Sequence, residues 1–427
     1  MSFDFAARRA RIAPQLGLTN EILLVGAGHP IAKPEISDAM LPFIAHQEYY
    51  FLTGLAEAMG SIVAFDPKNG AQSGWVSFIP EVTEAERVWE GRAQLPGEPM
   101  RNFPAWLAAR AGRPVVMFGV PVNGVAFDAV RTATVREAYK HARRPKESGE
   151  IDLLRRCAAA TAAGYVALQP FLRPGVSERR MQVELEAGYF REGANKTGYD
   201  TIIGVGAQSA ILHGTPARDR IAREGDFILV DSGAEWDRYV IDVTRTYVAG
   251  KPSAFQRDLM QAVLNAEVRA IEKCRPGTEW VEVHFGAALD LVGSLVDMGV
   301  LKGKPQSLIE QDAHTLFFPH GIGHMLGLGV RDAGGLEPGR TKSTRPSLAT
   351  LRQDLILQPG YVVTVEPGLY FIPPLLNDPA RRVKYRDCVN WDLADHMITI
   401  GGVRFEDDIL VTDGAPENLT AAIPKGT

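Results

Sequence analysis

Two aspartates lie in a stretch of chain with the alternating apolar pattern of a β-hairpin. The runs Phe227–Ala234 and Tyr239–Thr244 predict two strands, and a turn centred on Trp236–Asp237 would place Asp231 directly opposite Asp242. Carboxylates opposed on an antiparallel pair lie about 5 Å apart and repel each other, so they need a proton or a cation between them. A register slip that separates the two, or a turn with two solvated aspartates, is the alternative.

Two histidines occur four residues apart in the segment Pro319–His324. Two glycines in this segment argue against a helix and predict extended or looped backbone. In an extended chain His320 and His324 point to the same side. Paired histidines are candidates for metal binding or acid–base catalysis. Two hydrogen-bonded histidines on a surface loop are the alternative.

Three further charged residues belong to predicted strands. The run Val362–Glu366 is typical of a buried strand, although a glutamate at its end can simply mark the exit into solvent. In Gly402–Val411 the period of two puts Arg404 and Glu406 on one face, where they can form a plain ion pair.

Taken together, these segments supply carboxylates and imidazoles at several strand ends. The residues are Asp231, Asp242, Glu366 and Glu406, with His324 and His320. Four carboxylates carry about four negative charges, and such a cluster must take up protons or cations to be stable. Two divalent cations would neutralise it, so this set favours a two-metal site.

The elements around these residues occur twice in the same order. Helices are predicted from Ser148 and Ser177 in the first copy, and from Ser253 and Val281 in the second, with Arg-Pro-Gly between the members of each pair. Each helix pair is followed by a His-Gly dipeptide and then by apolar strands with acidic residues; the dipeptides are His213-Gly214 and His320-Gly321. A period of about a hundred residues is too long for a solenoid and indicates two related halves that face each other across a cleft.

The first third of the chain mixes strand and helix patterns. Short strands are predicted at 21–26, 60–65 and 75–79, and helices at 101–110 and 132–142. The polar segment 142–149 contains Pro and Gly and is a candidate linker. At about 150 residues per domain, 427 residues allow two or three domains. We predict domains at 1–145 and 146–427, both of the α/β class.

Composition excludes several classes of function. A net charge of −5 without blocks of like charge argues against a nucleic-acid partner or an anionic membrane surface. No apolar window approaches about 18 residues, and the first residues lack the apolar core of a secretion signal. The three cysteines lie far apart, which predicts reduced thiols. We therefore expect a cytoplasmic protein.

The ordered series of residues resembles the prolidase/aminopeptidase P group of metallopeptidases. The matching motifs, between about Glu147 and Thr412, are Ile211–Gly214, Asp231, Asp242–Thr246, Pro319–His324, Val365–Gly368 and Arg404–Asp407. The resemblance implies a pita-bread α/β catalytic fold with two pseudo-symmetric halves around a dinuclear centre. The stretch His46–Gly54 is similar, less specifically, to the smaller creatinase-type N-terminal domain of that group.

The resemblance also implies metal ligands. Asp231 would bind one ion, Asp242 and Glu406 would bridge both, and His324 and Glu366 would complete the other. Members of the group commonly depend on manganese or cobalt. Ligation by oxygen with a single imidazole suits manganese, and zinc remains open.

Catalytic roles follow from the same resemblance. Two ions about 3.5–4 Å apart can hold a bridging water and supply hydroxide near neutral pH. Glu366 would accept the proton of that water and pass it to the leaving proline nitrogen. Arg404 would hold a ligand carboxylate. The expected substrate-pocket residues are His213, His320, Arg331 and Tyr370. His213 and His320 are also expected to be catalytic, with His320 stabilising the oxyanion. The implied partners are a short peptide with proline and a second copy of the chain in a homodimer.

The chain departs from the group at Arg331, which stands where a third histidine is usual. Because a guanidinium binds carboxylates well, we expect Arg331 to bind the free carboxylate of a dipeptide; a neutral exchange at the pocket rim is the alternative. The long segment between Glu366 and Glu406, which includes 371–379, resembles an insertion typical of prolidases and favours an Xaa-Pro dipeptidase over an Xaa-Pro aminopeptidase. The rival from another class is a binding protein on the same fold that has lost its metals.

Overall fold

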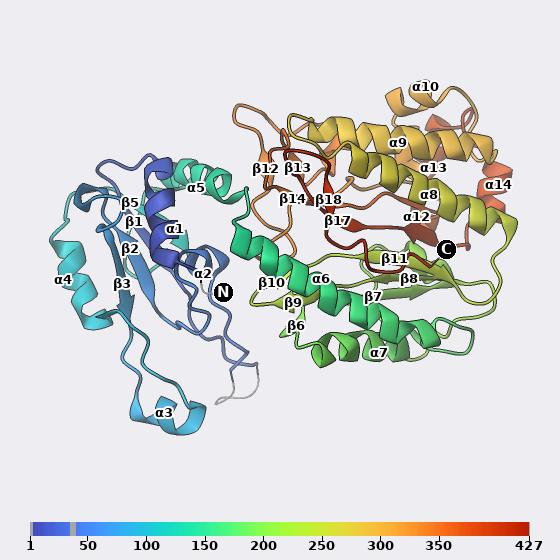
Figure 1. The fold of residues 1–427 in the computed structure, drawn as a ribbon. Helices are drawn as coiled ribbons and strands as arrows, with labels where there is room; N and C mark the ends of the chain where they lie inside the picture. The colour runs from blue at the N-terminus through green and yellow to red at the C-terminus, as the bar shows by residue number, and fades with distance from the viewer. Residues whose placement is uncertain (1–2, 35–39, 427) are drawn as a thin grey trace. The chain divides into compact units, whose positions relative to one another are not determined.

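The computed structural model describes residues 3–34 and 40–426, and the chain divides into two compact units, Met1–Arg143 and Arg144–Thr427 (Figure 1). The domain limits drawn above at residues 145 and 146 stay predictions. The mixed α/β class is confirmed in each unit, since both combine sheets with helices. In the described part of the chain, no helix is long and apolar enough to cross a membrane.

The first unit is built on a five-stranded sheet with the order β4-β3-β2-β1-β5. Its strands are β1 Ile22–Gly26, β2 Ile62–Phe65, β3 Trp75–Ile79, β4 Glu98–Pro99 and β5 Val115–Gly119. Its helices are α1 Phe5–Ile12, η1 Ala13–Leu16, α2 Gln47–Thr53, η2 Pro67–Asn69, α3 Glu84–Glu90, η3 Met100–Asn102, α4 Phe103–Ala108 and α5 Ala129–Arg143. The predicted strands are confirmed to within two residues. The predicted helix 101–110 is shorter, because Pro104 restricts its start to one turn of 3₁₀ geometry followed by α4.

The second unit begins with two pairs of long helices, as the repeated pattern predicted. The pairs are α6 Ser148–Leu168 with α7 Glu178–Arg191, and α8 Ala254–Glu272 with α9 Trp280–Asp297. Serines cap α7 and α8, at Ser177 and Ser253. The N-cap of α6 is Glu147 rather than the predicted Ser148, because Glu147 forms a capping box with Glu150.

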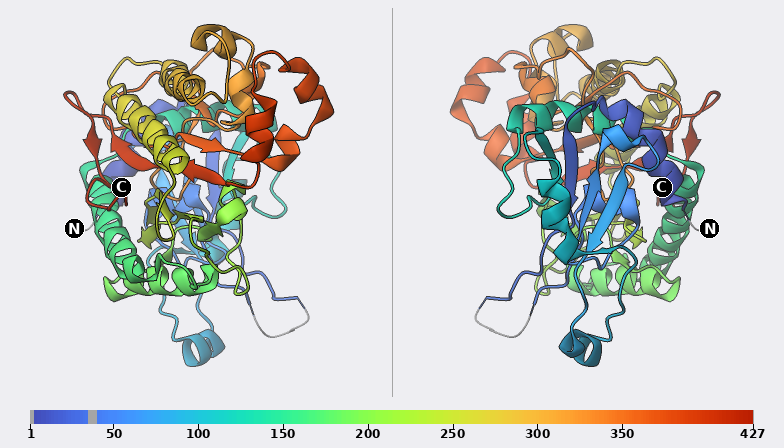
Figure 2. Two further views of the ribbon diagram at one scale, coloured as in Figure 1. Left: turned by 90° about the vertical axis from the view of Figure 1, so that its right-hand side faces the viewer. Right: turned by 90° about the vertical axis from the view of Figure 1, so that its left-hand side faces the viewer.

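Helices α6 and α7 cross closely through two glycines. A Cβ on Gly188 would lie 2.5 Å from the Cα of Gly164, so neither position leaves room for a side chain. In Figures 1 and 2 this pair covers one side of the strands of the second unit, and α8 and α9 cover the other. The helix pairs therefore hold the strand ends that carry the acidic residues.

The strands of the two halves form matching three-stranded sheets, β11-β8-β7 and β14-β17-β18. The strands of the second unit are β6 Lys196–Thr197, β7 Ile202–Val205, β8 Phe227–Asp231, β9 Ala234–Trp236, β10 Tyr239–Val240, β11 Thr244–Val248, β12 Gly335–Leu336, β13 Gln353–Asp354, β14 Val362–Val365, β15 Gly368–Tyr370, β16 Gly402–Arg404, β17 Asp407–Leu410 and β18 Glu417–Asn418. An antiparallel bridge between Thr244 and Glu406 joins the two halves. That bridge brings one acidic strand end of each half together.

The predicted hairpin register is wrong by one residue on each strand. The turn is formed by Asp237 and Arg238, whose φ angles of 49° and 71° are left-handed, and not by Trp236–Asp237. Asp231 therefore pairs with Thr244 instead of Asp242. Consecutive left-handed residues give the turn the twist that a two-residue hairpin loop needs, and asparagine or glycine usually signals it. The Asp-Arg dipeptide carries no such signal.

The segment between Glu366 and Glu406 folds into short helices. They are α12 Pro373–Leu376, α13 Pro379–Lys384 and α14 Trp391–His396. Leu376, Tyr385 and Ala394 anchor them in a hydrophobic cluster that also includes residues of α8 and α9. The remaining helical turns of this unit are η4 Gln169–Phe171, η5 Gly206–Ala210, α10 Pro305–Glu310, η6 Ala313–Leu316 and α11 Pro346–Ala349.

Candidate metal centre

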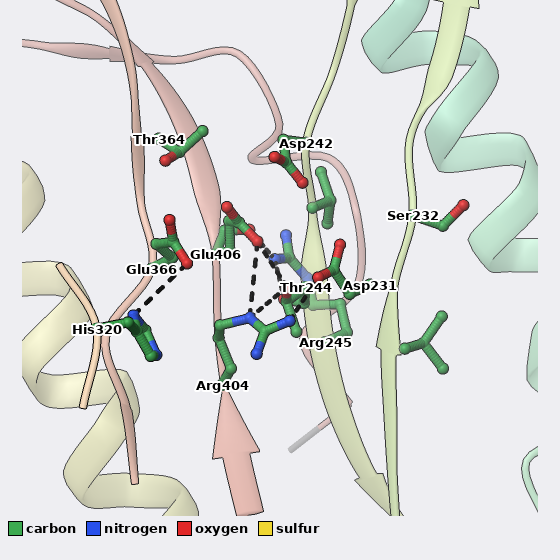
Figure 3. Close-up of polar contacts among 12 residues, drawn as sticks. Asp231, Ser232, Asp242, Thr244, Arg245, His320, Thr364, Glu366, Arg404 and Glu406 are labelled. Atoms are coloured by element: carbon green, nitrogen blue, oxygen red, sulfur yellow. Dashed lines mark hydrogen bonds and ion pairs between the residues drawn. The ribbon is translucent and has the colours of Figure 1, made fainter. Parts of the chain in front are cut away.

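The predicted acidic residues converge where the two halves meet (Figure 3). Asp231 ends β8, Asp242 lies two residues before β11, Glu366 follows β14 and Glu406 precedes β17. Ligand atoms of Asp242, His324 and Glu406 all lie within 4.8 Å of one another. This distance is short enough for one cation to contact all three.

His324 reaches this cluster because its segment runs beside β14. The backbone N–H of Thr364 donates to the His324 carbonyl (2.9 Å), and Glu366 N–H donates to the Ile322 carbonyl (2.8 Å). Gly323 makes the approach possible, since its φ is 155° and a Cβ there would lie 2.0 Å from the Thr364 carbonyl oxygen. Gly321 and Gly323, the two glycines that argued against a helix, therefore allow the extended segment that brings His324 next to Glu366.

The ring of His324 presents a lone pair to two carboxylates. Its Nδ1–H donates to the Met325 carbonyl (3.1 Å). Its Nε2 lies 3.4 Å from Asp242 Oδ2 and 3.9 Å from Glu366 Oε1. Burial would lower the pKa of His324, but Asp242 and Glu366 raise it overall. A lone pair facing two carboxylates is unfavourable unless a proton or a metal ion lies between them, so this geometry fits a metal ligand.

Tyr199 joins the two aspartates and was missed by sequence reasoning. Its hydroxyl lies 2.7 Å from Asp231 Oδ1 and 2.5 Å from Asp242 Oδ1. The one hydroxyl proton can serve only one of these oxygens at a time. The two side chains therefore converge even though their residues are not opposite in the ladder. No spacing in the sequence marks Tyr199, because it lies 32 and 43 residues before its two partners and reaches them only in the folded chain.

Arg404 is the buried cation of the cluster, with 4% of its surface exposed. Its guanidinium contacts Asp231 Oδ2 and donates from Nε to the Thr244 hydroxyl (2.9 Å). Thr244 in turn donates to Glu406 Oε2 (2.6 Å). Figure 3 shows Arg404 and Thr244 between Asp231 and Glu406. The predicted common face of Arg404 and Glu406 is consistent with the 3.9 Å between Arg404 Nε and Glu406 Oε2.

A single arginine leaves the cluster with excess negative charge. Burial raises the pKa of Asp231 to about 6, with Asp242 adding to the shift and Arg404 opposing it. Burial and neighbouring carboxylates raise the pKa of Glu366 to about 7, against the opposing effect of His324. Burial, Asp242 and Glu366 raise the pKa of Glu406 far above its usual range. Neighbouring buried carboxylates with raised pKa values are expected in a site where a bound cation balances their negative charge.

His320 lies beside the cluster and is held from both ring nitrogens. Its Nδ1–H donates to the Gly321 carbonyl (2.8 Å) and lies 3.8 Å from Glu366 Oε2. Its Nε2 accepts from the Tyr370 hydroxyl (2.9 Å), which accepts in turn from Arg404 Nη1 (2.9 Å). Burial and Arg404 lower the pKa of His320 to about 3, so the ring is neutral near neutral pH.

A cavity of about 550 Å³ opens over the cluster. Among the predicted site residues, those that line it are His213, Asp231, Asp242, His320, His324, Arg331, Glu366, Arg404 and Glu406. Tyr370 is fully buried behind His320 and is not on the cavity wall, so it orients His320 in place of the expected substrate contact. No residue of the segment 371–400 lines the cavity, so the long insertion does not shape it.

Two arginines stand on the cavity wall away from the carboxylates. Arg331 was predicted, whereas Arg352 was not. Both side chains are exposed, and each lowers the pKa of His213, after burial as the larger cause. The cavity therefore has an acidic floor and a basic side, which matches a substrate that carries a carboxylate.

Comparison with known proteins agrees with this site. Residues 152–413 match metallopeptidase family M24. The Xaa-Pro dipeptidase of Stenotrophomonas maltophilia strain K279a is 33% identical over 355 residues, which cover 82% of this chain and 76% of that protein. The Xaa-Pro aminopeptidase of Escherichia coli strain K12 is 37% identical over 281 residues, which cover 66% of this chain and 57% of that protein.

Solved structures show the same architecture. Aminopeptidase PepP of Pseudomonas aeruginosa superposes with a TM-score of 0.79 at 26% identity, over 98% of this chain and 95% of that one. Aminopeptidase P of Escherichia coli in complex with substrate gives a TM-score of 0.78 at 26% identity, over 100% and 96%. The predicted pita-bread α/β fold with a smaller N-terminal domain is therefore confirmed.

Proposed function

The chain belongs to metallopeptidase family M24, and on that basis we propose that it hydrolyses the Xaa-Pro bond of short peptides with two divalent metal ions. The observation that carries the proposal is the convergence of four carboxylates and one imidazole on the floor of one cavity. The names of its relatives as Xaa-Pro dipeptidases and aminopeptidases support the substrate class.

The donor set fits two divalent ions. Asp231, Asp242, His324, Glu366 and Glu406 would hold the two ions. The single Tyr199 hydroxyl between two carboxylates, and the His324 lone pair facing two more oxygens, are arrangements that cations relieve. One imidazole among oxygen ligands suits manganese, with cobalt or zinc as alternatives. When bound, such ions activate a water molecule as a hydroxide and polarise the scissile carbonyl.

The residues around the ligands would then handle the proton and the substrate. Glu366 is the ligand carboxylate whose second oxygen faces His320, so it is placed to take a proton from the attacking water and return it to the proline nitrogen. His320 is neutral and carries its proton on Nδ1, on the side of Glu366. It would stabilise the oxyanion by sharing this N–H with the substrate. Tyr370 and Arg404 would keep that tautomer in place.

The basic side of the cavity favours dipeptides. A dipeptide presents its free carboxylate one residue from the scissile bond, within the reach of a cavity of this size, whereas a tripeptide replaces it there with a neutral amide. Arg331 and Arg352 line the cavity and form no ion pair with another described residue, so both can bind a substrate carboxylate. The Xaa-Pro aminopeptidase activity of other relatives is the second candidate, since those enzymes share the fold.

Exchange of Arg331 for histidine tests this preference. We expect kcat/KM for an Xaa-Pro dipeptide to fall about tenfold or more, because one charge-assisted hydrogen bond to the substrate is weakened, with a change of less than threefold for the matching Xaa-Pro-Xaa tripeptide. Arg352→Met should show the same selectivity. Arg155→Met, a change far from the cavity on α6, is the control.

The assay is a panel of dipeptides and tripeptides with added manganese, cobalt or zinc. Equal losses on both substrate lengths would dismiss the carboxylate role and favour the aminopeptidase. A wild-type protein that binds none of the three metals and cleaves no Xaa-Pro peptide would favour the rival, a binding protein that has lost its metals. Manganese as the native ion, a homodimer and a cytoplasmic location go with the proposal as further expectations from the family resemblance.

A further inference from the structure

The segment after β18 lies against the side of β11 and β17 that faces away from the cavity. The Ile423 carbonyl accepts from Arg245 Nη2 (3.1 Å), and the Thr420 hydroxyl donates to Asp407 Oδ1 (2.8 Å). Lys425 Nζ lies 2.8 Å from Asp407 Oδ2 and also contacts Glu267 Oε2 on α8. Figure 1 shows the C-terminus beside β8 and β11. The last residues of the chain therefore reach a buried ionic cluster.

Lys425 is one of two cations that contact the buried carboxyl groups of that cluster. The side chains of Asp407 and Glu267 are 0% exposed, as is that of Arg245. Burial and Asp407 raise the pKa of Glu267 to about 8, against the opposing effects of Lys425 and Arg245. Asp407 contacts both cations, and of the two only Lys425 comes from outside the strands. Loss of one partner from a buried ion pair leaves an uncompensated charge.

The cluster is connected to the metal centre through Arg245 and the backbone. Arg245 donates from Nη2 to Asp407 Oδ1 (2.7 Å) and from Nη1 to the Glu406 carbonyl (2.7 Å). It also donates to the Thr244 carbonyl (3.0 Å), and Thr244 binds Glu406 through its hydroxyl. Asp407 follows Glu406 directly in the chain. A shift of Asp407 or Arg245 would therefore move a carboxylate of the metal centre.

We infer that Lys425 is a positioning residue for Glu406, and that docking of the C-terminal segment sets the metal affinity of the enzyme. The inference rests on the proposed function only in taking Glu406 as a metal ligand. Lys425 touches neither the cavity nor any of the five ligand side chains, so its effect passes through Asp407 and Arg245. Residues that orient metal ligands typically contribute about 10- to 100-fold to metal affinity.

The test measures manganese binding to the full-length, metal-free protein by isothermal titration calorimetry. We expect Lys425→Met to raise the dissociation constant for Mn²⁺ about tenfold or more, and Lys425→Arg to restore it to within about threefold of wild type. Lys302→Met, an exposed lysine of the same unit without an ion pair among the described residues, should bind as wild type does.

A double variant separates positioning from folding. Glu267→Gln in the Lys425→Met background removes one uncompensated buried carboxylate without restoring the contact to Asp407. We expect it to recover the thermal unfolding midpoint of wild type while manganese binding stays weak. Wild-type affinity in a folded Lys425→Met or double variant would overturn the inference. A wild-type protein that binds no manganese, cobalt or zinc would instead overturn the proposed function and this inference with it.

Discussion

Exchange of Glu406 for glutamine will remove most of the bound metal and lower kcat/KM by about 10³-fold or more. Glu406 is 2% exposed, and its position links the two halves through the Thr244–Glu406 bridge. Glutamine keeps the size and the hydrogen bond from Thr244 but loses the negative charge that two cations would share. A metal-centred reaction that loses several kcal/mol of transition-state stabilisation slows by this factor.

The measurement is elemental analysis of the purified variant together with steady-state kinetics at saturating manganese. Glu417→Gln, on β18 next to β17, is the matched control, because its carboxylate pairs with Arg155 at the surface. It should keep metal and activity. A Glu406→Gln variant with full metal content and near-normal kcat/KM would show that Glu406 is not a ligand.

Replacement of His320 by alanine will lower kcat about 10²- to 10³-fold and leave the metal content unchanged. The ring lies beside Glu366 but has both nitrogens in hydrogen bonds to protein groups, so neither nitrogen is free to bind a cation. Removing one oxyanion donor typically costs this factor in kcat. The effect should fall on kcat rather than KM, because the interaction forms with the transition state.

His396→Ala, an exposed histidine at the end of α14, is the control and should be neutral. Kinetics and metal content are to be measured on the same preparations. Loss of metal in His320→Ala would make His320 a ligand. A drop in affinity for substrate without a change in kcat would limit the residue to binding.

The candidate ligands could be predicted from the sequence because each of them ends or flanks an apolar run. The run Val362–Val365 forms β14 as predicted and delivers Glu366, and the two glycines before His324 give the extended segment beside it. The helix pairs could be predicted for a similar reason, because the spacing of their apolar residues and their capping residues are local features of the sequence. Local patterns therefore located the residues and the duplicated frame that carries them.

The strand register of the hairpin and the contacts between distant residues could not be predicted from local sequence patterns. The turn of the hairpin depends on two left-handed residues, Asp237 and Arg238, that no turn signal announces. The side chains of Asp231 and Asp242 still converge through Tyr199, whose sequence neighbourhood contains no metal-binding motif. These contacts arise when distant segments pack, so a single sequence does not encode them as a pattern.

The preference for dipeptides stays a prediction, and of the two features that suggested it, Arg331 and the insertion, only Arg331 lines the cavity. The insertion at 371–379 forms short helices in the hydrophobic core and contributes nothing to the cavity wall. Arg352, which passed unnoticed in the sequence, lies on that wall together with Arg331. Whether an arginine can contact the substrate depends on where it lies relative to the cavity, and this position is known only from the folded structure.

The central claim is that the acidic side chains of both halves converge to hold paired divalent ions. Its most direct test is the metal stoichiometry of the wild-type protein, measured by elemental analysis after dialysis against manganese and compared with peptidase activity before and after chelation. The account predicts about two ions per chain and activity that disappears on chelation and returns with manganese. A folded protein that takes up no divalent ion, or that cleaves Xaa-Pro peptides equally well without one, would contradict it.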